Sequence, residues 1–209
     1  MAQNYKVYIN NKEIIFTDDE ITSIDADNDD DNLKIYDNPS VNDVKKIISD
    51  FVLNEKPQTL FLASPDSKNL FREFRNDYKL VKAAGGLVRD KDNRILCIFR
   101  RGKWDLPKGK IDRDERRKHA ALREVREETG LDTLFIVRKF DKTYHVYTEK
   151  NAHILKKTYW YEMAAVRSEP LKPQAEEDIT DIRWFEPDEL DEVFENTYTL
   201  VRRLLEGIK

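Results

Sequence analysis

GKIDRDERRKHAALREVREETGL, residues 109–131, has a glycine near each end and a dense run of charged residues in its second half. At 100° per residue, Glu124, Glu127 and Glu128 fall within one arc of about 100° on a helix. Three carboxylates held this close repel one another, so we expect cations to offset that cost. Hard oxygen ligands favour Mg²⁺, which also binds phosphate oxygens. This stretch therefore predicts a magnesium site on a helix.

Gly130 predicts where this helix ends, because glycine takes the left-handed conformation after a helix without strain. An apolar arc next to the glutamates allows the helix to bury one side. A solvated helix face laced with ion pairs is the alternative interpretation of such a charge run. A surface helix has no need for Gly109, Glu115 and Gly130 at these spacings, which favours a functional site.

The whole stretch resembles the Nudix box, G-x5-E-x7-R-E-U-x-E-E-x-G-U, in which U is aliphatic; Val125 and Leu131 fill the two U positions. The resemblance to the Nudix hydrolase family implies an α/β fold, an α/β/α sandwich with a mixed sheet. It also implies that a glycine carbonyl joins the glutamates around Mg²⁺, with Mn²⁺ as an alternative metal. The expected metal ligands are Gly109, Glu115, Glu124, Glu127 and Glu128.

The implied reaction is Mg²⁺-dependent hydrolysis of a diphosphate linkage in a nucleoside diphosphate derivative, by attack of a metal-activated water. Arg123 stands four residues before Glu127, where an ion pair could orient that carboxylate. Glu177 follows where many family members carry a loop glutamate that reaches the metals or serves as base; a solvated acidic loop is the alternative. The box does not fix the general base. The expected catalytic residues are Arg123, Glu124, Glu127, Glu128 and Glu177.

The segment WDLPKGK, residues 104–110, resembles the lead into the box of Nudix enzymes that act on dinucleoside polyphosphates or diphosphoinositol polyphosphates. Its lysines could neutralise phosphates, although exposed lysines before a helix are often only solvating residues. Tyr147 stands roughly where such hydrolases place a base-stacking tyrosine, and a sheet aromatic is the alternative. The expected substrate-binding residues are Arg100, Trp104, Lys108, Lys110 and Tyr147.

These clues favour a dinucleoside polyphosphate-like substrate, with ADP-ribose or a nucleotide sugar as alternatives. A hypothesis from another class is a Nudix fold that senses nucleotides without cleaving them. The partners expected are a small phosphorylated substrate and, as an option, a second copy of the chain in a homodimer. An intact box argues for the enzyme.

Composition limits the class of protein. Residues 1–80 hold 10 Lys and Arg against 16 Asp and Glu, and residues 81–209 hold 27 against 25. Neither part is strongly basic, so we expect no nucleic-acid partner. No apolar run approaches the roughly 20 residues that span a bilayer, and the start of the chain has no signal-peptide pattern, which predicts a cytoplasmic protein without a membrane partner. Cys97 lies in an apolar run, where an inert buried thiol is expected.

The chain is expected to hold two regions, a small N-terminal α/β region (1–78) of unknown role and a Nudix domain (79–209). The first region predicts a hairpin (5–16), an acidic loop (18–32), a helix (41–53), a strand (59–63) and a helix (66–75). The second predicts strands at 80–89, 95–101, 132–148, 153–166 and 180–185, a loop at 102–114, and helices at 115–129 and 192–208.

Overall fold

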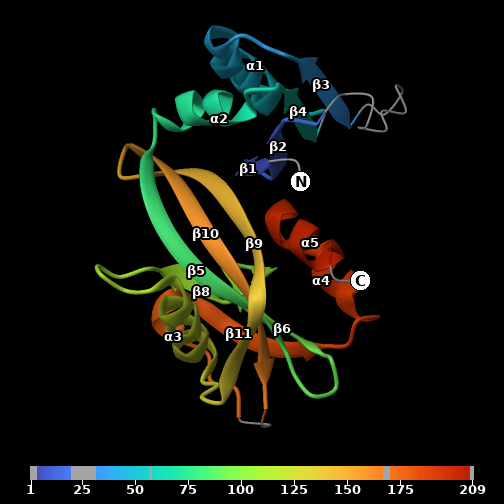
Figure 1. Ribbon diagram of the computed structural model, residues 1–209. Helices are drawn as coiled ribbons and strands as arrows, with labels where there is room; N and C mark the ends of the chain where they lie inside the picture. Colours follow the sequence, from blue (N-terminus) through green and yellow to red (C-terminus); the bar gives the residue numbers. More distant parts are fainter. Residues whose placement is uncertain (1–3, 20–31, 57, 167–169, 208–209) are drawn as a thin grey trace. The chain divides into compact units, whose positions relative to one another are not determined.

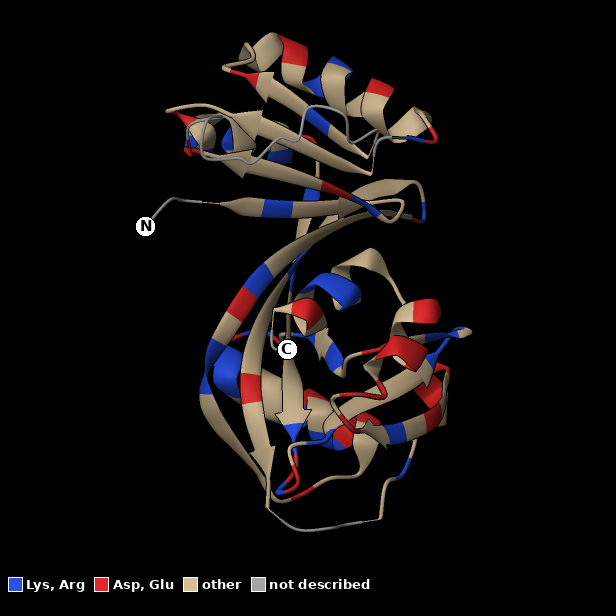
Figure 2. Cartoon of the chain, turned by 90° about the vertical axis from the view of Figure 1, so that its right-hand side faces the viewer, with Lys and Arg blue, Asp and Glu red and all other residues tan. Residues whose placement is uncertain are grey.

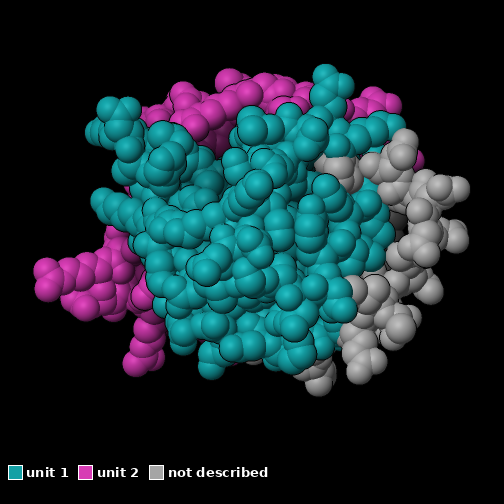
Figure 3. Space-filling view, turned by 90° about the horizontal axis from the view of Figure 1, so that it is seen from above, with its two compact units in different colours: residues 1–80, 143–156 teal, residues 81–142, 157–209 magenta. Residues whose placement is uncertain are grey.

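The computed structural model describes residues 4–19, 32–56, 58–166 and 170–207 (Figure 1). The chain forms two compact units, coloured separately in Figure 3: residues 1–80 with 143–156, and residues 81–142 with 157–209. The long strands β9 (Leu134–Glu149) and β10 (Ala152–Ala165) contribute residues to both units. One boundary near residue 78 was expected from the sequence. In the structure, residues 143–156 of the β9–β10 hairpin also group with the first unit.

In the first unit, the strand order is β9-β1-β2-β4-β3, with both parallel and antiparallel neighbours. Its elements are β1 (Tyr5–Ile9), β2 (Lys12–Thr17), β3 (Leu33–Asp37), α1 (Val41–Leu53), β4 (Thr59–Ala63) and α2 (Ser67–Arg75). The expected hairpin is confirmed, and Asn10 and Asn11 form its turn with positive φ angles, which asparagine tolerates. Most of the expected acidic loop, residues 20–31, lies outside the described residues.

Strand β3 was not predicted, because it follows directly on the acidic stretch and none of its residues is fully buried, unlike the apolar strands β1 and β4. The helix predictions for this unit are confirmed, and side chains cap both helices. Ser40 accepts a hydrogen bond from the Asp43 amide at the start of α1, and Asp66 accepts one from the Asn69 amide at the start of α2. The core of the unit includes Tyr144 and Leu155 from the β9–β10 hairpin.

The second unit has the expected α/β/α arrangement around strands in the order β11-β6-β5-β10-β9. Its elements are β5 (Lys79–Arg89), β6 (Ile95–Arg100), β7 (Lys103–Asp105), β8 (Lys108–Lys110), α3 (Arg117–Thr129), the 3-10 turn η2 (Ala175–Glu177), β11 (Ile179–Phe185), α4 (Leu190–Glu195) and α5 (Thr199–Glu206). Helix α3 packs on one apolar cluster of the sheet, and α4 and α5 pack on another (Figure 1).

Two expectations for this unit need correction. The loop expected at 102–114 contains the short strands β7 and β8, which pair with β6 and β5. The helix expected at 192–208 is broken into α4 and α5. The cause is a contact with a distant segment, because the Trp104 amide donates to the Asn196 carbonyl at 2.9 Å and the Thr197 hydroxyl donates to the Trp104 carbonyl at 2.7 Å.

In the described part of the chain, no helix is both long enough and apolar enough to span a membrane. Acidic and basic residues are interspersed over the elements of each unit (Figure 2).

Candidate active site

Helix α3 presents the glutamates because its other side is fully buried. Ala120, Ala121 and Val125 pack in the apolar cluster under the helix. The helix ends as the sequence predicts, since Gly130 adopts φ +77° and its amide donates to the Arg126 carbonyl at 2.8 Å. The glutamate arc is thereby held at the edge of a packed helix.

Arg123 joins the acidic residues of this stretch. Its guanidinium bonds both carboxylate oxygens of Glu115, at 3.0 and 2.9 Å, and bonds Glu124 at 2.7 Å and Glu127 at 2.9 Å. It also donates to the Lys110 carbonyl at 3.0 Å. Hydrogen bonds from Arg123 lower the pKa of Glu115 below its ordinary value. One cation therefore orients three carboxylates and ties α3 to the strand before it.

Glu124 lies directly against the backbone of Gly109. A Cβ atom at position 109 would fall 1.7 Å from Oε2 of Glu124, so only glycine leaves room for this carboxylate. Strand β8 carries Gly109 and pairs with β5, which fixes the glycine backbone. Burial raises the pKa of Glu124, against the opposing effect of Arg123.

Glu128 is the most buried acidic residue of the site, with 1% of the residue exposed. It accepts a hydrogen bond from the Lys108 amide at 2.7 Å, and one of its oxygens lies 3.6 Å from the Arg100 guanidinium. Burial raises the pKa of Glu128 to about 7, although the hydrogen bond from the Lys108 amide and the positive charges of Lys108 and Arg100 all act to lower it. The carboxylate is thus under-compensated, and an additional cation would stabilise its charged form.

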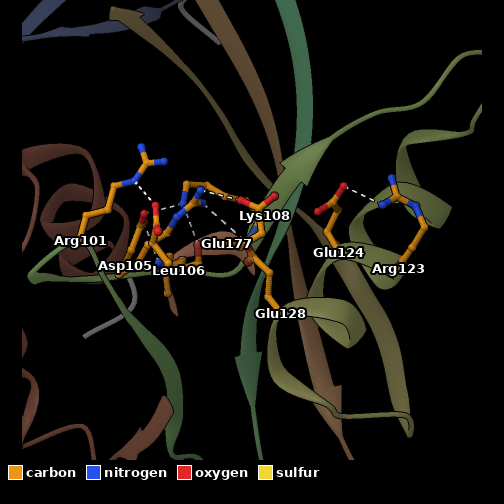
Figure 4. Close-up of polar contacts among 10 residues, drawn as sticks. Arg101, Asp105, Leu106, Lys108, Arg123, Glu124, Glu128 and Glu177 are labelled. Carbon is orange, nitrogen blue, oxygen red and sulfur yellow. Dashed lines mark hydrogen bonds and ion pairs between the residues drawn. The ribbon is translucent and has the colours of Figure 1, made fainter. Parts of the chain in front are cut away.

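Basic residues around Glu128 are paired with acids from other elements (Figure 4). The Lys108 ammonium contacts Asp105 at 2.5 Å and the Leu106 carbonyl at 3.2 Å. Arg100 bonds Glu177 on η2 at 2.7 Å, and Arg101 bonds Asp178 at 3.0 Å. Glu177 therefore lies beside the arginine that also approaches Glu128.

The residues present fit a divalent ion that prefers oxygen ligands. The Gly109 backbone and the Glu124 carboxylate converge where a Cβ would otherwise stand, and the buried Glu128 lacks full compensation of its charge. Among the residues that the structure describes, no three His, Cys, Asp or Glu side chains already form a cage for a metal ion. Arg123 accounts for part of this, because it holds three of the carboxylates in ion pairs.

A model of the NUDIX domain matches residues 79–204, which is more than half of the chain. The chain belongs to the Nudix family. Nudix enzymes generally use a divalent metal ion. The solved MutT protein from Methanosarcina mazei Go1 shares the fold, with a TM-score of 0.50 and 22% identity over 63% of this chain and 94% of that one.

The chain is similar to two curated proteins, and it matches most of the length of one but only about a third of the length of the other. A MutT-like protein of Streptomyces ambofaciens is 30% identical over 132 residues, which cover 61% of this chain and 76% of the relative. The mRNA-decapping enzyme subunit 2 of Arabidopsis thaliana is 25% identical over 126 residues, covering 58% of this chain. The matched segment spans only 32% of that decapping subunit.

The structure brings most of the expected Nudix site residues together, but it does not bring in Trp104. The residue is 7% exposed, and its ring packs edge-on against Phe99 and Phe185 in the core under α4 and α5. Its place in the sequence, next to the box, suggested a substrate contact, whereas in the structure its ring fills the core. Lys110 is exposed and contributes its carbonyl to Arg123.

Tyr147 lies in the part of β9 that groups with the first unit, with its ring 5.6 Å from that of His145. Sequence reasoning missed Asp105, which is buried, contacts Lys108 and accepts a hydrogen bond from the Leu106 amide at 2.8 Å. The available signal for this contact was the spacing of Asp105 and Lys108, an acid three residues before a lysine in an otherwise largely apolar segment.

Proposed function

We propose that this Nudix domain hydrolyses a pyrophosphate linkage in a nucleoside diphosphate derivative with the help of Mg²⁺. The observation that carries the proposal is that two carboxylates of α3 meet the backbone of β8: Glu124 lies against Gly109, and the buried Glu128 accepts a hydrogen bond from the Lys108 amide. These groups would hold the metal, with Glu115 and Glu127 as further ligands if Arg123 releases them. When bound, Mg²⁺ activates a water and stabilises negative charge on the phosphates.

The chain's own residues supply orientation and proton transfer. Arg123 keeps Glu124 in place, and Glu127 as well until a metal binds it, because one guanidinium nitrogen, Nη1, donates to both carboxylates. Glu177 is the proposed general base, since it stands beside the site without being part of the box. Lys108 and Lys110 are the proposed phosphate contacts, and for Lys108 this requires the ammonium to exchange Asp105 for a phosphate oxygen.

The preferred substrate is a dinucleoside polyphosphate or a closely similar compound. The segment 104–110 supports this preference, and so does the relation to an mRNA-decapping enzyme, because an mRNA cap also joins two nucleosides through a phosphate bridge. Because the chain is also similar to a MutT-like protein, nucleoside triphosphates are tested as alternative substrates.

A panel of substrates tests the proposal. Purified protein (residues 1–209) is incubated with dinucleoside polyphosphates, a cap analogue, ADP-ribose, a nucleotide sugar and nucleoside triphosphates, and products are identified by mass spectrometry. We expect cleavage within a phosphate bridge with Mg²⁺ and none after chelation, with dinucleoside polyphosphates cleaved fastest. Tight binding measured by calorimetry without turnover of any compound would support the sensing module instead.

A further inference from the structure

Arg100 contacts two carboxylates that come from different elements. Its guanidinium lies 2.7 Å from Glu177, on η2, and 3.6 Å from Glu128, on α3. The Arg100 side chain is 17% exposed, whereas that of Glu177 is 49% exposed. The arginine is therefore the more buried partner and the one whose position the surrounding structure restricts.

The pairing of β6 with β11 explains why these residues meet. Ile179, at the start of β11, pairs with Arg100 at the end of β6, and Glu177 precedes Ile179 by two residues. The chain turns just before the strand, where the Asp178 amide donates to the Ala175 carbonyl at 3.0 Å and Asp178 adopts φ +59°. This register carries the Glu177 carboxylate to the Arg100 guanidinium.

The Arg100 guanidinium joins these two carboxylates through its terminal nitrogens. Its buried Nε atom has no hydrogen-bond partner within the described ranges, so the terminal nitrogens alone anchor the guanidinium. Hydrogen bonds between charged groups are stronger than neutral ones, and an arginine fork suits two oxygen acceptors.

We infer that Arg100 is a positioning residue that holds Glu177 beside the box glutamates, and that it is not a substrate contact. The inference rests on the proposed function, in which Glu177 is the general base. It changes the role expected for Arg100 from the sequence, because the nearest charged group to its guanidinium is the Glu177 carboxylate at 2.7 Å, with the Glu128 carboxylate next at 3.6 Å.

A double-mutant cycle separates these two roles. If Arg100 acts through Glu177, Arg100→Gln lowers kcat about 10- to 100-fold in the wild-type background, as loss of an orienting partner commonly does. The same substitution then lowers kcat less than roughly threefold when Glu177 is already Gln, because the two changes share one interaction. KM changes little, and Arg100→Lys restores part of kcat.

Arg101→Gln is the matched control. Arg101 is the next residue and pairs with the same loop through Asp178, but both side chains are well exposed, at 65% and 61%. Exposed pairs contribute little, so we expect near wild-type kcat. Equal loss from Arg100→Gln in both backgrounds, or a raised KM with unchanged kcat, would overturn the inference and assign Arg100 to the substrate.

Hydrogen exchange gives a readout that does not depend on turnover. In metal-free protein, Arg100→Gln should speed amide exchange in the peptide 174–178, whereas Arg101→Gln should leave it close to wild type. Unchanged amide exchange in Arg100→Gln would show that Arg100 does not hold Glu177 and its loop in place. If the wild type cleaves no compound in the panel, the proposed function fails, and the exchange result still decides whether Arg100 holds the loop.

Discussion

The carboxylate of Glu124 lies so close to the Cα atom of Gly109 that no side chain fits between them. A Cβ at position 109 would lie 1.7 Å from Oε2 and 2.1 Å from Cδ of Glu124. The contact joins β8 to α3, and both of its residues belong to the Nudix box. It puts a backbone segment and a carboxylate where one metal ion could reach both.

Gly109→Ala should therefore displace the Glu124 carboxylate. We expect kcat/KM to fall about 100-fold, because displacements near 1 Å at a reacting centre have effects of that order. The clash involves the end of a flexible side chain, so the melting temperature should change little. Gly207→Ala is the control, since a Cβ there has its nearest neighbours at 3.6 and 3.7 Å. A fully active Gly109→Ala enzyme would mean that this contact has no part in the reaction.

Arg123→Lys should reduce activity while keeping the charge. A lysine ammonium cannot bond Glu115, Glu124 and Glu127 together with the Lys110 carbonyl, because it lacks the planar fork of the guanidinium. We expect kcat to fall about 10- to 100-fold and the free energy of unfolding to fall by roughly 1–2 kcal/mol. Steady-state kinetics and urea unfolding measure both. Wild-type values for Arg123→Lys would show that the charge alone matters.

Glu128 predicts how the stability of the metal-free protein depends on pH. Its pKa rises from 4.5 to about 7 on folding, so the folded state binds the proton more tightly than the unfolded state. This contribution is fully present below pH 4.5 and is lost as pH rises through 7, to a total of about 3 kcal/mol. Urea unfolding in chelator at pH 5 and pH 8 should show the loss in the wild type.

Glu128→Gln is the control for that measurement, because a glutamine can still accept the hydrogen bond from the Lys108 amide and does not titrate. Its stability should depend less on pH between 5 and 8 than that of the wild type. Mg²⁺ should stabilise the wild type more at pH 8 than at pH 5, since the metal competes with the proton. Equal slopes with pH for wild type and variant would contradict the account of this carboxylate.

Local chemistry made much of the site predictable. The helical period places the three glutamates on one arc, the left-handed residue after the helix needs Gly130, and the spacing of four predicts the contact of Arg123 with Glu127. Each of these depends on residues near one another in the chain. The additional contacts of Arg123 with Glu115 and Glu124 extend the same cluster.

The remainder depends on contacts between distant segments. Arg100 and Glu177 are 77 residues apart, and only the register of β6 with β11 brings them together. The break between α4 and α5 arises because Trp104 pairs with the backbone of residues 196 and 197, which helical periodicity does not reveal. The β9–β10 hairpin similarly carries Tyr144 and Leu155 into the first unit's core, although both residues lie far along the chain from the other elements of that unit.

Glu124 and Glu128 are the proposed ligands of the metal ion used for hydrolysis. The most direct measurement compares Mg²⁺-dependent turnover of the best panel substrate by the wild type, Glu124→Gln, Glu128→Gln and the control Glu195→Gln, whose side chain is exposed. We predict that each site variant loses at least about 100-fold in kcat, of the order found when a single transition-state contact is removed, and that Glu195→Gln keeps the wild-type rate. Wild-type turnover by Glu124→Gln and Glu128→Gln would contradict the account.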